Sequence, residues 1–233
     1  AAGFYRPHTP YVAPKKYFDL YDLDETQMPE MPANYQETVP ASALSSTPEW
    51  PNFNTTEEEA RECKLAYDAC ISFVDAQVGR LLSAVDELGL RENTIIVLWG
   101  DHGYHLGEHG LWRKNSLYEE SARAPLIISS PGIASNPQDC DRIVEFVDIY
   151  PTITDLAGLT PPKEIEGVSL RPLMTQPDAQ WDRPAYIQTL FVDVPGYSVR
   201  TDRWRYIEWG EQGIKGIELY DQLNDPKEMN NLA

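Results

Sequence analysis

Basic residues are scarce in this sequence of 233 residues, in which 19 lysines and arginines stand against 37 aspartates and glutamates. The net charge of −18 repels phosphate backbones, so no nucleic-acid partner is expected. The three cysteines are too scattered for a disulfide scaffold or a four-thiolate metal site. The longest uninterrupted hydrophobic run, residues 95–99, is far too short to cross a bilayer. These absences leave an acidic globular protein, most simply an enzyme or part of one.

Regular periodicity is absent from residues 6–54. Prolines recur throughout this segment, and neither a helical nor an alternating apolar pattern survives. Long irregular segments in compact domains are usually lids or binding loops. Because aromatic residues are frequent between Phe4 and Tyr35, we expect the segment to pack on the protein and not to act as a free linker.

A long helix is predicted after residue 55. Thr56 and Glu59 have the spacing of a capping box, and the apolar positions that follow recur with a helical period up to Gly89, a typical C-terminal stop. Cys63 and Cys70 fall on the apolar stripe of this helix, which favours packing over redox chemistry.

Two continuous apolar runs, at residues 94–99 and 125–128, are typical of strands buried on both faces. A further helix is predicted over residues 149–156, with Asp148 as its cap and Gly158 after its end. Helices that alternate with such strands predict an α/β fold, in which helices cover both faces of a sheet.

The pattern changes near residue 171, where short alternating segments begin. They predict strands at 185–188 and 197–200, and an antiparallel hairpin in which residues 201–202 make the turn into 204–207. Residues 218–221 and a turn at 224–226 follow. We therefore predict an α/β part over residues 1–170, which includes the irregular segment, and a small antiparallel β subdomain over residues 171–233.

Residues suited to chemistry follow the first apolar run. Asp101 and His102 are adjacent, and both can reach one cation if Gly103 permits a bend. Open α/β sheets place ligands at this end of a strand. Arg113 and Lys114 follow as cations for an anion held near the metal, which suits transfer of sulfate or phosphate. Taken alone, the aspartate is equally well explained as a turn residue and the histidine as a structural one.

His105 and His109 lie in the same loop. With the preceding histidine, their spacing resembles a zinc cluster, but the glycines of the loop argue against a helical presentation of the rings. We expect these two histidines to contact the substrate or to support a neighbouring ligand. Glu108 is expected to tether a neighbouring group of the loop.

Motifs across the chain can be compared with one known family. The main ones are Asp101-His102-Gly103, Leu106-Gly107-Glu108-His109-Gly110, Trp112, Lys114 and Arg123-Ala124-Pro125-Leu126-Ile127. They resemble the type I sulfatases of the alkaline-phosphatase superfamily, and within them iduronate-2-sulfatase and its bacterial relatives. Residues 3–11, 67–82 and 218–233 are similar to the same family. The resemblance implies part of an alkaline-phosphatase-like sheet followed by a small C-terminal antiparallel sheet.

The resemblance also implies roles for individual residues. Asp101 and His102 would be two ligands of one divalent cation, usually calcium, although calcium prefers oxygen ligands. Lys114 would contact the sulfate or the leaving oxygen. His8 would donate a proton to the departing alcohol, which suits a histidine near neutral pH. Trp112 belongs to the same motif, and we place it with His105, His109 and Arg113 among the candidate substrate contacts.

One part of the family's machinery is missing from the sequence. Sulfatases use a formylglycine made from the first residue of a Cys/Ser-x-Pro-x-Arg motif, and no cysteine or serine here begins that pattern. The early aspartates that complete the metal site and the first half of the sheet are missing too. We therefore predict the C-terminal half of a sulfatase, inactive alone, whose N-terminal half supplies the nucleophile.

The predicted activity is hydrolysis of sulfate esters on sugars or polysaccharides by an exported enzyme. The substrate class and the export both rest on the resemblance. The nearest alternative is a phosphonate monoester hydrolase or phosphodiesterase of the same superfamily, because such enzymes carry similar motifs. A non-catalytic fragment that binds anionic glycans is the alternative outside enzymes: the missing nucleophile supports it, and the net charge of −18 opposes it.

Overall fold

The computed structural model describes residues 1–133, 138–191 and 194–233, and the chain divides into two compact units. Unit 1 consists of Ala1–Met31, Thr47–Glu92 and His105–Trp112. Unit 2 consists of Pro32–Ser46, Asn93–Tyr104 and Arg113–Ala233. Because the units alternate along the chain, their division does not coincide with the boundary expected at residue 171, which stays a prediction.

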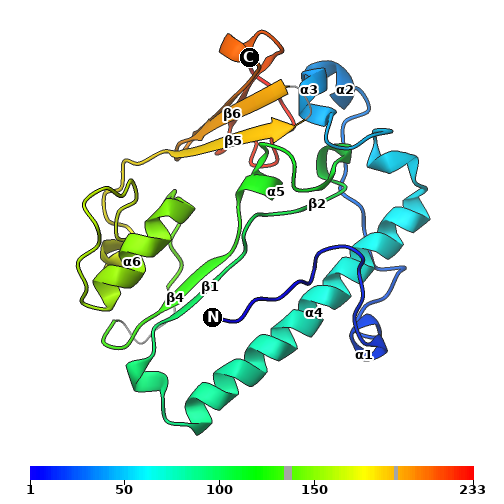
Figure 1. Cartoon of the computed structure of the whole chain (residues 1–233). Coiled ribbons are helices and arrows are strands. Elements are labelled where there is room, and N and C mark those ends of the chain that lie inside the picture. The colour runs from blue at the N-terminus through cyan, green and yellow to red at the C-terminus, as the bar shows by residue number, and fades with distance from the viewer. Residues whose placement is uncertain (134–137, 192–193) are drawn as a thin grey trace. The chain divides into compact units, whose positions relative to one another are not determined.

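Both units contain helices and strands (Figure 1). In unit 1 these are α1 (Lys15–Phe18), α4 (Glu57–Glu87), β2 (His105–Leu106) and the 3-10 turns η1 (Asn52–Asn54) and η3 (Glu108–Gly110). Unit 2 holds α2 (Tyr35–Thr38), α3 (Ala41–Leu44), β1 (Ile96–Trp99), α5 (Glu119–Ala122), β4 (Leu126–Ser129), η4 (Phe146–Asp148), α6 (Ile149–Leu156), α7 (Arg171–Thr175), β5 (Ala185–Phe191), β6 (Val194–Arg200), β7 (Trp204–Trp209), η5 (Glu211–Gly213) and β8 (Ile217–Asp221). Two short elements lie where the chain passes from one unit to the other: η2 (Arg91–Asn93) and β3 (Trp112–Arg113). Strand β3 pairs with β2.

The long helix α4 forms where the sequence predicts it. The Thr56 hydroxyl accepts from the Glu59 N–H at 3.2 Å, and the Glu59 carboxylate accepts from the Thr56 N–H at 2.8 Å. The hydrogen bonds that the Thr56 N–H and the Thr56 hydroxyl donate to the Glu59 carboxylate lower the pKa of this carboxyl. Cys70 is buried and Cys63 half-buried, and burial raises the pKa of both thiols, in agreement with a packing role. In the described residues, no helix has the length and hydropathy of a membrane span.

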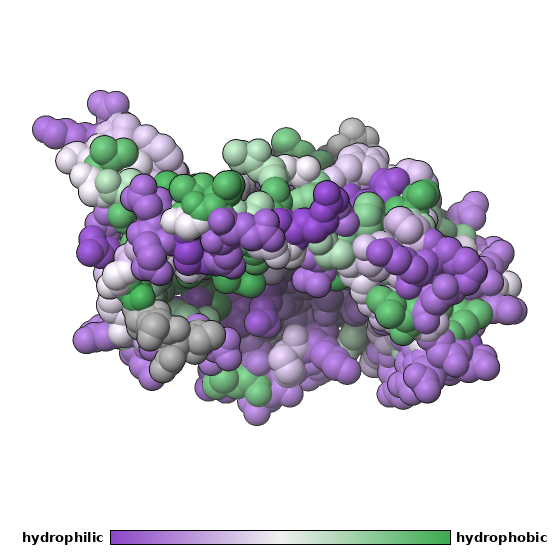
Figure 2. Space-filling model, turned by 90° about the horizontal axis from the view of Figure 1, so that it is seen from below, coloured by the Kyte–Doolittle hydropathy of each residue, from purple (hydrophilic) through white to green (hydrophobic). Residues whose placement is uncertain are grey.

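The irregular segment 6–54 is packed, as its aromatic residues predict. In unit 1 the ring of Tyr17 lies 5.4 Å from that of Phe73 on α4, and in unit 2 Tyr35 is buried. Large apolar side chains also reach the surface in both units, among them Tyr5 and Tyr186. Figure 2 shows hydrophobic residues, in green, among hydrophilic ones on the face it views.

Strands β1 and β4 form a two-stranded antiparallel ribbon in unit 2 (Figure 1). The two apolar runs correctly predict these strands. The predicted burial on both faces is wrong for this structure, because none of the side chains in the two four-residue strands is buried. Five of the eight side chains are half-buried and three are exposed, so neither face of the ribbon is fully covered.

The C-terminal strands form an antiparallel sheet in the order β5–β6–β7–β8, which confirms the prediction of a small C-terminal sheet. Its core includes the buried side chains of Ile207, Trp209 and Tyr220. At Gly196 on β6 a Cβ would lie 2.6 Å from the Trp209 ring. Glycine at this position therefore lets the indole pack directly against the neighbouring backbone.

Two carboxylates are buried in unit 2, and each has hydrogen-bond donors around it. Glu218 accepts from the Tyr118 hydroxyl at 2.7 Å, the Tyr220 hydroxyl at 2.6 Å and the Trp209 Nε1–H at 2.8 Å. Glu228 is paired with the guanidinium of Arg205. Because a buried charge is costly unless it is paired, these contacts fix the end of the chain onto the sheet.

Asp148 does not cap α6 with its side chain, which corrects the sequence prediction. Its carboxylate instead accepts from the Glu145 N–H at 3.0 Å and the Val168 N–H at 2.8 Å. The carboxylate is used by the capping box of the 3-10 turn η4, which comes directly before α6, and by the distant Val168 N–H, so it does not cap α6. Gly158, with a φ of +70°, follows the end of the helix as predicted.

Candidate active site

The predicted site begins where β1 ends, in unit 2. The Gly100 N–H still donates to a carbonyl of the opposite strand segment, at 3.0 Å, so the chain leaves the ribbon at Asp101. At Gly103 a Cβ would lie only 2.0 Å from the Glu120 carbonyl oxygen. Only glycine fits such a close approach, and the turn that carries Asp101 and His102 is thereby held against α5.

Asp101 and His102 direct polar atoms toward each other. Asp101 Oδ2 lies 3.6 Å from His102 Nε2, and the Asp101 side chain is 87% exposed. His102 Nδ1 lies 2.7 Å from the Gly103 carbonyl oxygen. Because a carbonyl can only accept, Nδ1 carries the proton of the neutral ring. The lone pair of Nε2 is therefore free on the side of Asp101.

This donor pair fits part of a divalent-cation site. A histidine that binds a metal usually donates its other ring N–H to a carbonyl or carboxylate, and His102 has that arrangement. The separation of 3.6 Å suits two ligand atoms that share one ion at about 2.3–2.6 Å. Calcium takes about six to eight ligands, so the pair would need further oxygen donors.

Arg113 and Lys114 also belong to unit 2. Arg113 is exposed and has a left-handed φ of +73°, a conformation that side chains rarely adopt. Lys114 is half-buried, and within the residues that the structure describes its ammonium makes no hydrogen bond or ion pair. The roles that the sequence predicts for both side chains stay predictions.

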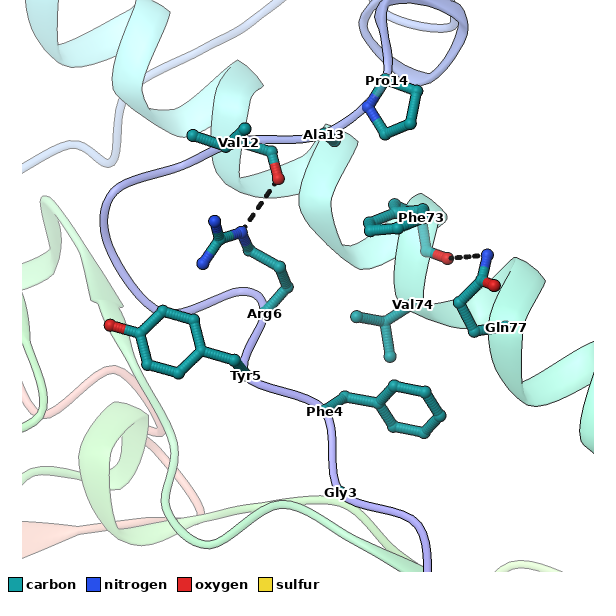
Figure 3. Close-up of a pocket in the computed structure, with 10 residues that line it drawn as sticks. All are labelled: Gly3, Phe4, Tyr5, Arg6, Val12, Ala13, Pro14, Phe73, Val74 and Gln77. Carbon is teal, nitrogen blue, oxygen red and sulfur yellow. Dashed lines mark hydrogen bonds between the residues drawn. The ribbon is translucent and has the colours of Figure 1, made fainter.

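His8 lies on the N-terminal segment of unit 1. Its Nδ1 is 2.7 Å from the Thr9 carbonyl oxygen, so Nε2 is left for proton transfer on this exposed side chain. Arg6 holds the segment in shape: its Nε donates to the Val12 carbonyl at 2.9 Å, and its guanidinium lies 5.0 Å from the centre of the Tyr5 ring (Figure 3).

An open groove of about 580 Å³ lies between this segment and α4 (Figure 3). Its walls are mostly apolar, with Phe4, Phe73 and Val74 among them, and Arg6 is the one charged residue in its lining. The Arg6 Nε–H donates to the Val12 carbonyl, and the Nη1 group donates to the His8 carbonyl at 3.4 Å. The groove contains none of the predicted site residues.

His105, His109 and Trp112 are buried in unit 1, and the rings of the two histidines meet edge to face with centroids 5.8 Å apart. Their placement is typical of packing residues, and their contact with substrate stays a prediction. The Glu108 carboxylate accepts from the Leu106 N–H at 2.6 Å. It therefore tethers the loop as the sequence predicts.

Sequence reasoning missed the segment that holds this loop in place. Asn52 Oδ1 accepts from the Trp112 Nε1–H at 3.0 Å, and the Trp50 Nε1–H donates to the His109 carbonyl at 2.8 Å. At Gly110 a Cβ would lie 2.6 Å from the Trp50 indole. In the sequence these partners appear only as part of a proline-rich irregular stretch, so no local pattern could reveal their role.

The comparisons with known families identify the chain. The sulfatase family model matches residues 2–159, and the model described as N-sulphoglucosamine sulphohydrolase, C-terminal, matches residues 107–233. Together the two matches cover residues 2–233. The chain belongs to the sulfatase family.

Curated relatives agree with this assignment. A sulfatase of Formosa agariphila is 37% identical over 100% of this chain, and a choline-sulfatase of Rhizobium meliloti is 34% identical over 99% of it. In each case the match covers 45% of the relative. The chain therefore spans about half the length of the curated relatives it matches.

Solved structures share the fold. An enzyme in complex with its substrate D-glucosamine-2-N,6-O-disulfate has a TM-score of 0.78 and 25% identity, over 97% of this chain and 59% of that one. A phosphonate monoester hydrolase from Silicibacter pomeroyi has a TM-score of 0.82 and 26% identity, over 98% of this chain and 50% of that one. These similarities confirm the predicted fold class, an alkaline-phosphatase-like α/β architecture with a small C-terminal antiparallel sheet.

Proposed function

We propose that the intact protein is a calcium-dependent sulfatase that hydrolyses sulfate esters of sugars or polysaccharides, and that this chain is its C-terminal half. The observation that carries the proposal is the Asp101–His102 pair, fixed at the end of β1 in a chain of the sulfatase family. The neighbour solved with a disulfated glucosamine supports the substrate class. Export of the enzyme is part of the proposal and is supported by the family resemblance alone.

The residues of this chain have distinct roles in the proposed reaction. Asp101 and His102 hold the cation, which when bound supplies Lewis acidity toward the sulfate oxygens. The upstream half supplies the formylglycine nucleophile. Lys114 places a positive charge beside the sulfate, where negative charge develops. His8, protonated at Nε2, gives that proton to the alcohol oxygen as the sulfur–oxygen bond breaks.

The remaining candidate residues have two kinds of role in this proposal. Arg113 is exposed and suits contact with an anionic sugar. The burial of His105, His109 and Trp112 supports an indirect contribution, in which these side chains give the loop its shape.

Two measurements on the native enzyme test the proposal. Peptide mapping by mass spectrometry is expected to find a Cys/Ser-x-Pro-x-Arg peptide whose first residue is an aldehyde. Hydrolysis of 4-nitrophenyl sulfate is expected to stop with a chelator and to return with Ca²⁺. If no such peptide exists and sulfated glycans bind without turnover, the chain is a non-catalytic binding fragment.

Substitution of the pair gives a sharper prediction. Asp101→Asn and His102→Ala in the full-length enzyme should each lower kcat/KM by about 100-fold or more, because each removes a ligand of the cation. Isothermal titration with Ca²⁺ should show weaker binding in both. Asp141→Asn, an exposed carboxylate of the same unit, is the matched control and should leave both measurements unchanged. Full activity of the Asp101→Asn enzyme would exclude the proposed metal site.

The second candidate is a phosphonate monoester hydrolase of the same superfamily. It is favoured by the TM-score of 0.82 to such an enzyme. The ratio of kcat/KM for 4-nitrophenyl sulfate and 4-nitrophenyl phenylphosphonate separates the two. Both esters are singly charged and have the same leaving group, so the ratio reports the preference for a sulfur or a phosphorus centre. A preference for the phosphonate by more than about tenfold would replace the sulfatase proposal.

A further inference from the structure

A guanidinium on the C-terminal sheet is bound to the start of α5. Arg205 on β7 is 1% exposed, and its Nη1 donates to the Leu117 carbonyl at 3.1 Å. Its Nη2 donates to the Glu119 carboxylate and its Nε to that of Glu228. Glu228 also accepts from the Glu119 N–H at 2.8 Å. Arg205 therefore binds the chain just before α5 directly, and binds the first residue of α5 both directly and through Glu228.

The other end of α5 holds the turn of the candidate site. The Ser121 carbonyl accepts from the Gly103 N–H at 2.8 Å, and the Gly103 carbonyl oxygen is 2.7 Å from His102 Nδ1. Helix α5 has only four residues, and the Arg123 N–H donates to the Glu119 carbonyl at 2.8 Å across this single turn. Because one hydrogen-bonded turn moves as a unit, a shift at its first residue also moves the carbonyls at its end.

We propose that Arg205 is a positioning residue of the candidate active site. By fixing α5 it sets the Gly103 carbonyl, which in turn fixes the His102 imidazole. The inference rests on the proposed function, because it takes the Asp101–His102 pair as the cation ligands. The group that accepts from the second nitrogen of a metal-binding histidine orients its ring, and loss of such a partner typically costs about 10–100-fold in metal affinity or activity. The C-terminal sheet, which contains none of the candidate site residues, thus takes part in the reaction.

The chemistry of this network suits a positioning role. The Nε of Arg200 lies 3.6 Å from the Glu119 carboxylate, so two guanidinium groups face the two carboxylates of Glu119 and Glu228. A buried hydrogen-bonded network of this kind makes the groups that it joins rigid. The planar guanidinium of Arg205 also presents its donors in a fixed fork, which defines the direction of each group that it binds. Lysine keeps the charge but has no fork.

Two arginines of the C-terminal sheet give a matched pair of variants. Arg205→Lys keeps the charge and removes the fork that binds α5. Arg203 donates to the Asp221 carboxylate at 2.8 and 3.1 Å, a contact within the sheet, so Arg203→Lys is the control. Glu119→Gln is a milder second variant, because it keeps the backbone bond to Glu228 and removes the charge that Arg205 binds. It decides the question if circular dichroism shows that Arg205→Lys does not fold.

The first measurement is the tautomer of His102 in the full-length enzyme, freed of metal with a chelator. Nitrogen–proton NMR spectra of enzyme with isotope-labelled histidines show which ring nitrogen carries the proton, at a pH where the ring is neutral. His102→Ala assigns the signal. We expect the Nδ1–H form in wild type and in Arg203→Lys. In Arg205→Lys we expect a mixture of both tautomers, because the Gly103 carbonyl is no longer held in place.

The second measurement is the affinity for Ca²⁺, by isothermal titration of the same enzymes. Arg205→Lys should bind Ca²⁺ about tenfold more weakly than wild type, Glu119→Gln should change in the same direction, and Arg203→Lys should not change. Excess Ca²⁺ should restore the hydrolysis of 4-nitrophenyl sulfate by Arg205→Lys, which a general loss of folded protein would not allow.

Wild-type tautomer and wild-type affinity in Arg205→Lys, or in Glu119→Gln where Arg205→Lys does not fold, would overturn the positioning role. The tautomer is read without metal or turnover. An enzyme that binds no Ca²⁺, and in which Arg205→Lys still changes the His102 tautomer, would therefore contradict the proposed function and leave the positioning role intact.

Discussion

At the scale of single residues, the buried carboxylate of Glu218 in unit 2 is held by more hydrogen bonds than the Asp101 carboxylate of the candidate site. Glu218 accepts hydrogen bonds from two tyrosine hydroxyls and one indole. Burial is the main cause that raises the pKa values of Tyr35, Tyr118 and Tyr220 above the ordinary range. The phenols therefore stay neutral and continue to donate where exposed tyrosines ionise.

The hydroxyl of Tyr118 is one of these donors, and its removal can be tested. Tyr118→Phe should lower the free energy of unfolding at pH 7 by about 1–3 kcal/mol, because Glu218 loses a donor in a buried site. Urea unfolding followed by circular dichroism measures it, and Tyr186→Phe, an exposed tyrosine of the same unit, should change nothing. In wild type the raised phenol pKa values contribute stability below about pH 10. That stability should be lost as the pH rises further, because the unfolded chain ionises first.

At the scale of elements, close approaches of the backbone decide which substitutions are tolerated. Gly103 has carbonyl oxygens of two other residues within 2.4 Å of the position of a Cβ. Gly79, inside α4, has nothing within 4 Å of that position. The first glycine is required by packing, and the second weakens the helix that contains it.

Alanine variants at these two glycines should therefore change the stability of the chain in opposite directions. Gly103→Ala should destabilise the chain by about 1–3 kcal/mol or more, because the backbone of α5 must shift. Gly79→Ala should stabilise it by about 0.5–1 kcal/mol, because alanine is the better helix former. Differential scanning calorimetry of both variants tests the pair. A Gly103→Ala protein as stable as wild type would show that the turn after Asp101 is not held against α5.

Elements with local signals were predictable, and those held by distant partners were not. The capping box of α4 and the alternating strands of the C-terminal sheet each depend on a pattern within a few neighbouring residues. The hydrogen bonds of Trp50 and Asn52 to the loop of His109 and Trp112 join distant positions, and no sequence period marks them. For the site, the adjacency of Asp101 and His102 was evident, whereas the Gly103 carbonyl that orients the imidazole appears only in three dimensions.

At the scale of the whole molecule, the surplus of 37 acidic over 19 basic residues makes stability depend on pH in two opposed ways. Acidification relieves the mutual repulsion of carboxylates, which favours the compact state. It also protonates carboxylates that the fold uses. Hydrogen bonds from Arg203 are the first cause that lowers the pKa of Asp221 to about 2.

Asp221 should thus act as one of the acid-sensitive contacts of the fold. Its folded pKa lies below the unfolded value of about 3.9, so its contribution is present above about pH 4 and is lost as the pH falls toward 2. Asp221→Asn should be less stable than wild type at pH 7, with a difference that shrinks steadily in urea titrations between pH 5 and about pH 2–3. Asp141→Asn serves as the control. A difference that is constant across this range would mean that the Asp221 carboxylate contributes nothing through its charge.

The alternation of the two units along the chain has a consequence for the order of synthesis. Each unit is assembled from three separate stretches. Unit 1 therefore stays incomplete until residues 105–112 have left the ribosome. The second unit waits longer, since its sheet ends at β8 and its buried ion pair needs Glu228. Closing such long loops delays folding. The nascent protein therefore carries its exposed apolar segments until the last of these stretches has been made, a period in which chaperones have access to them.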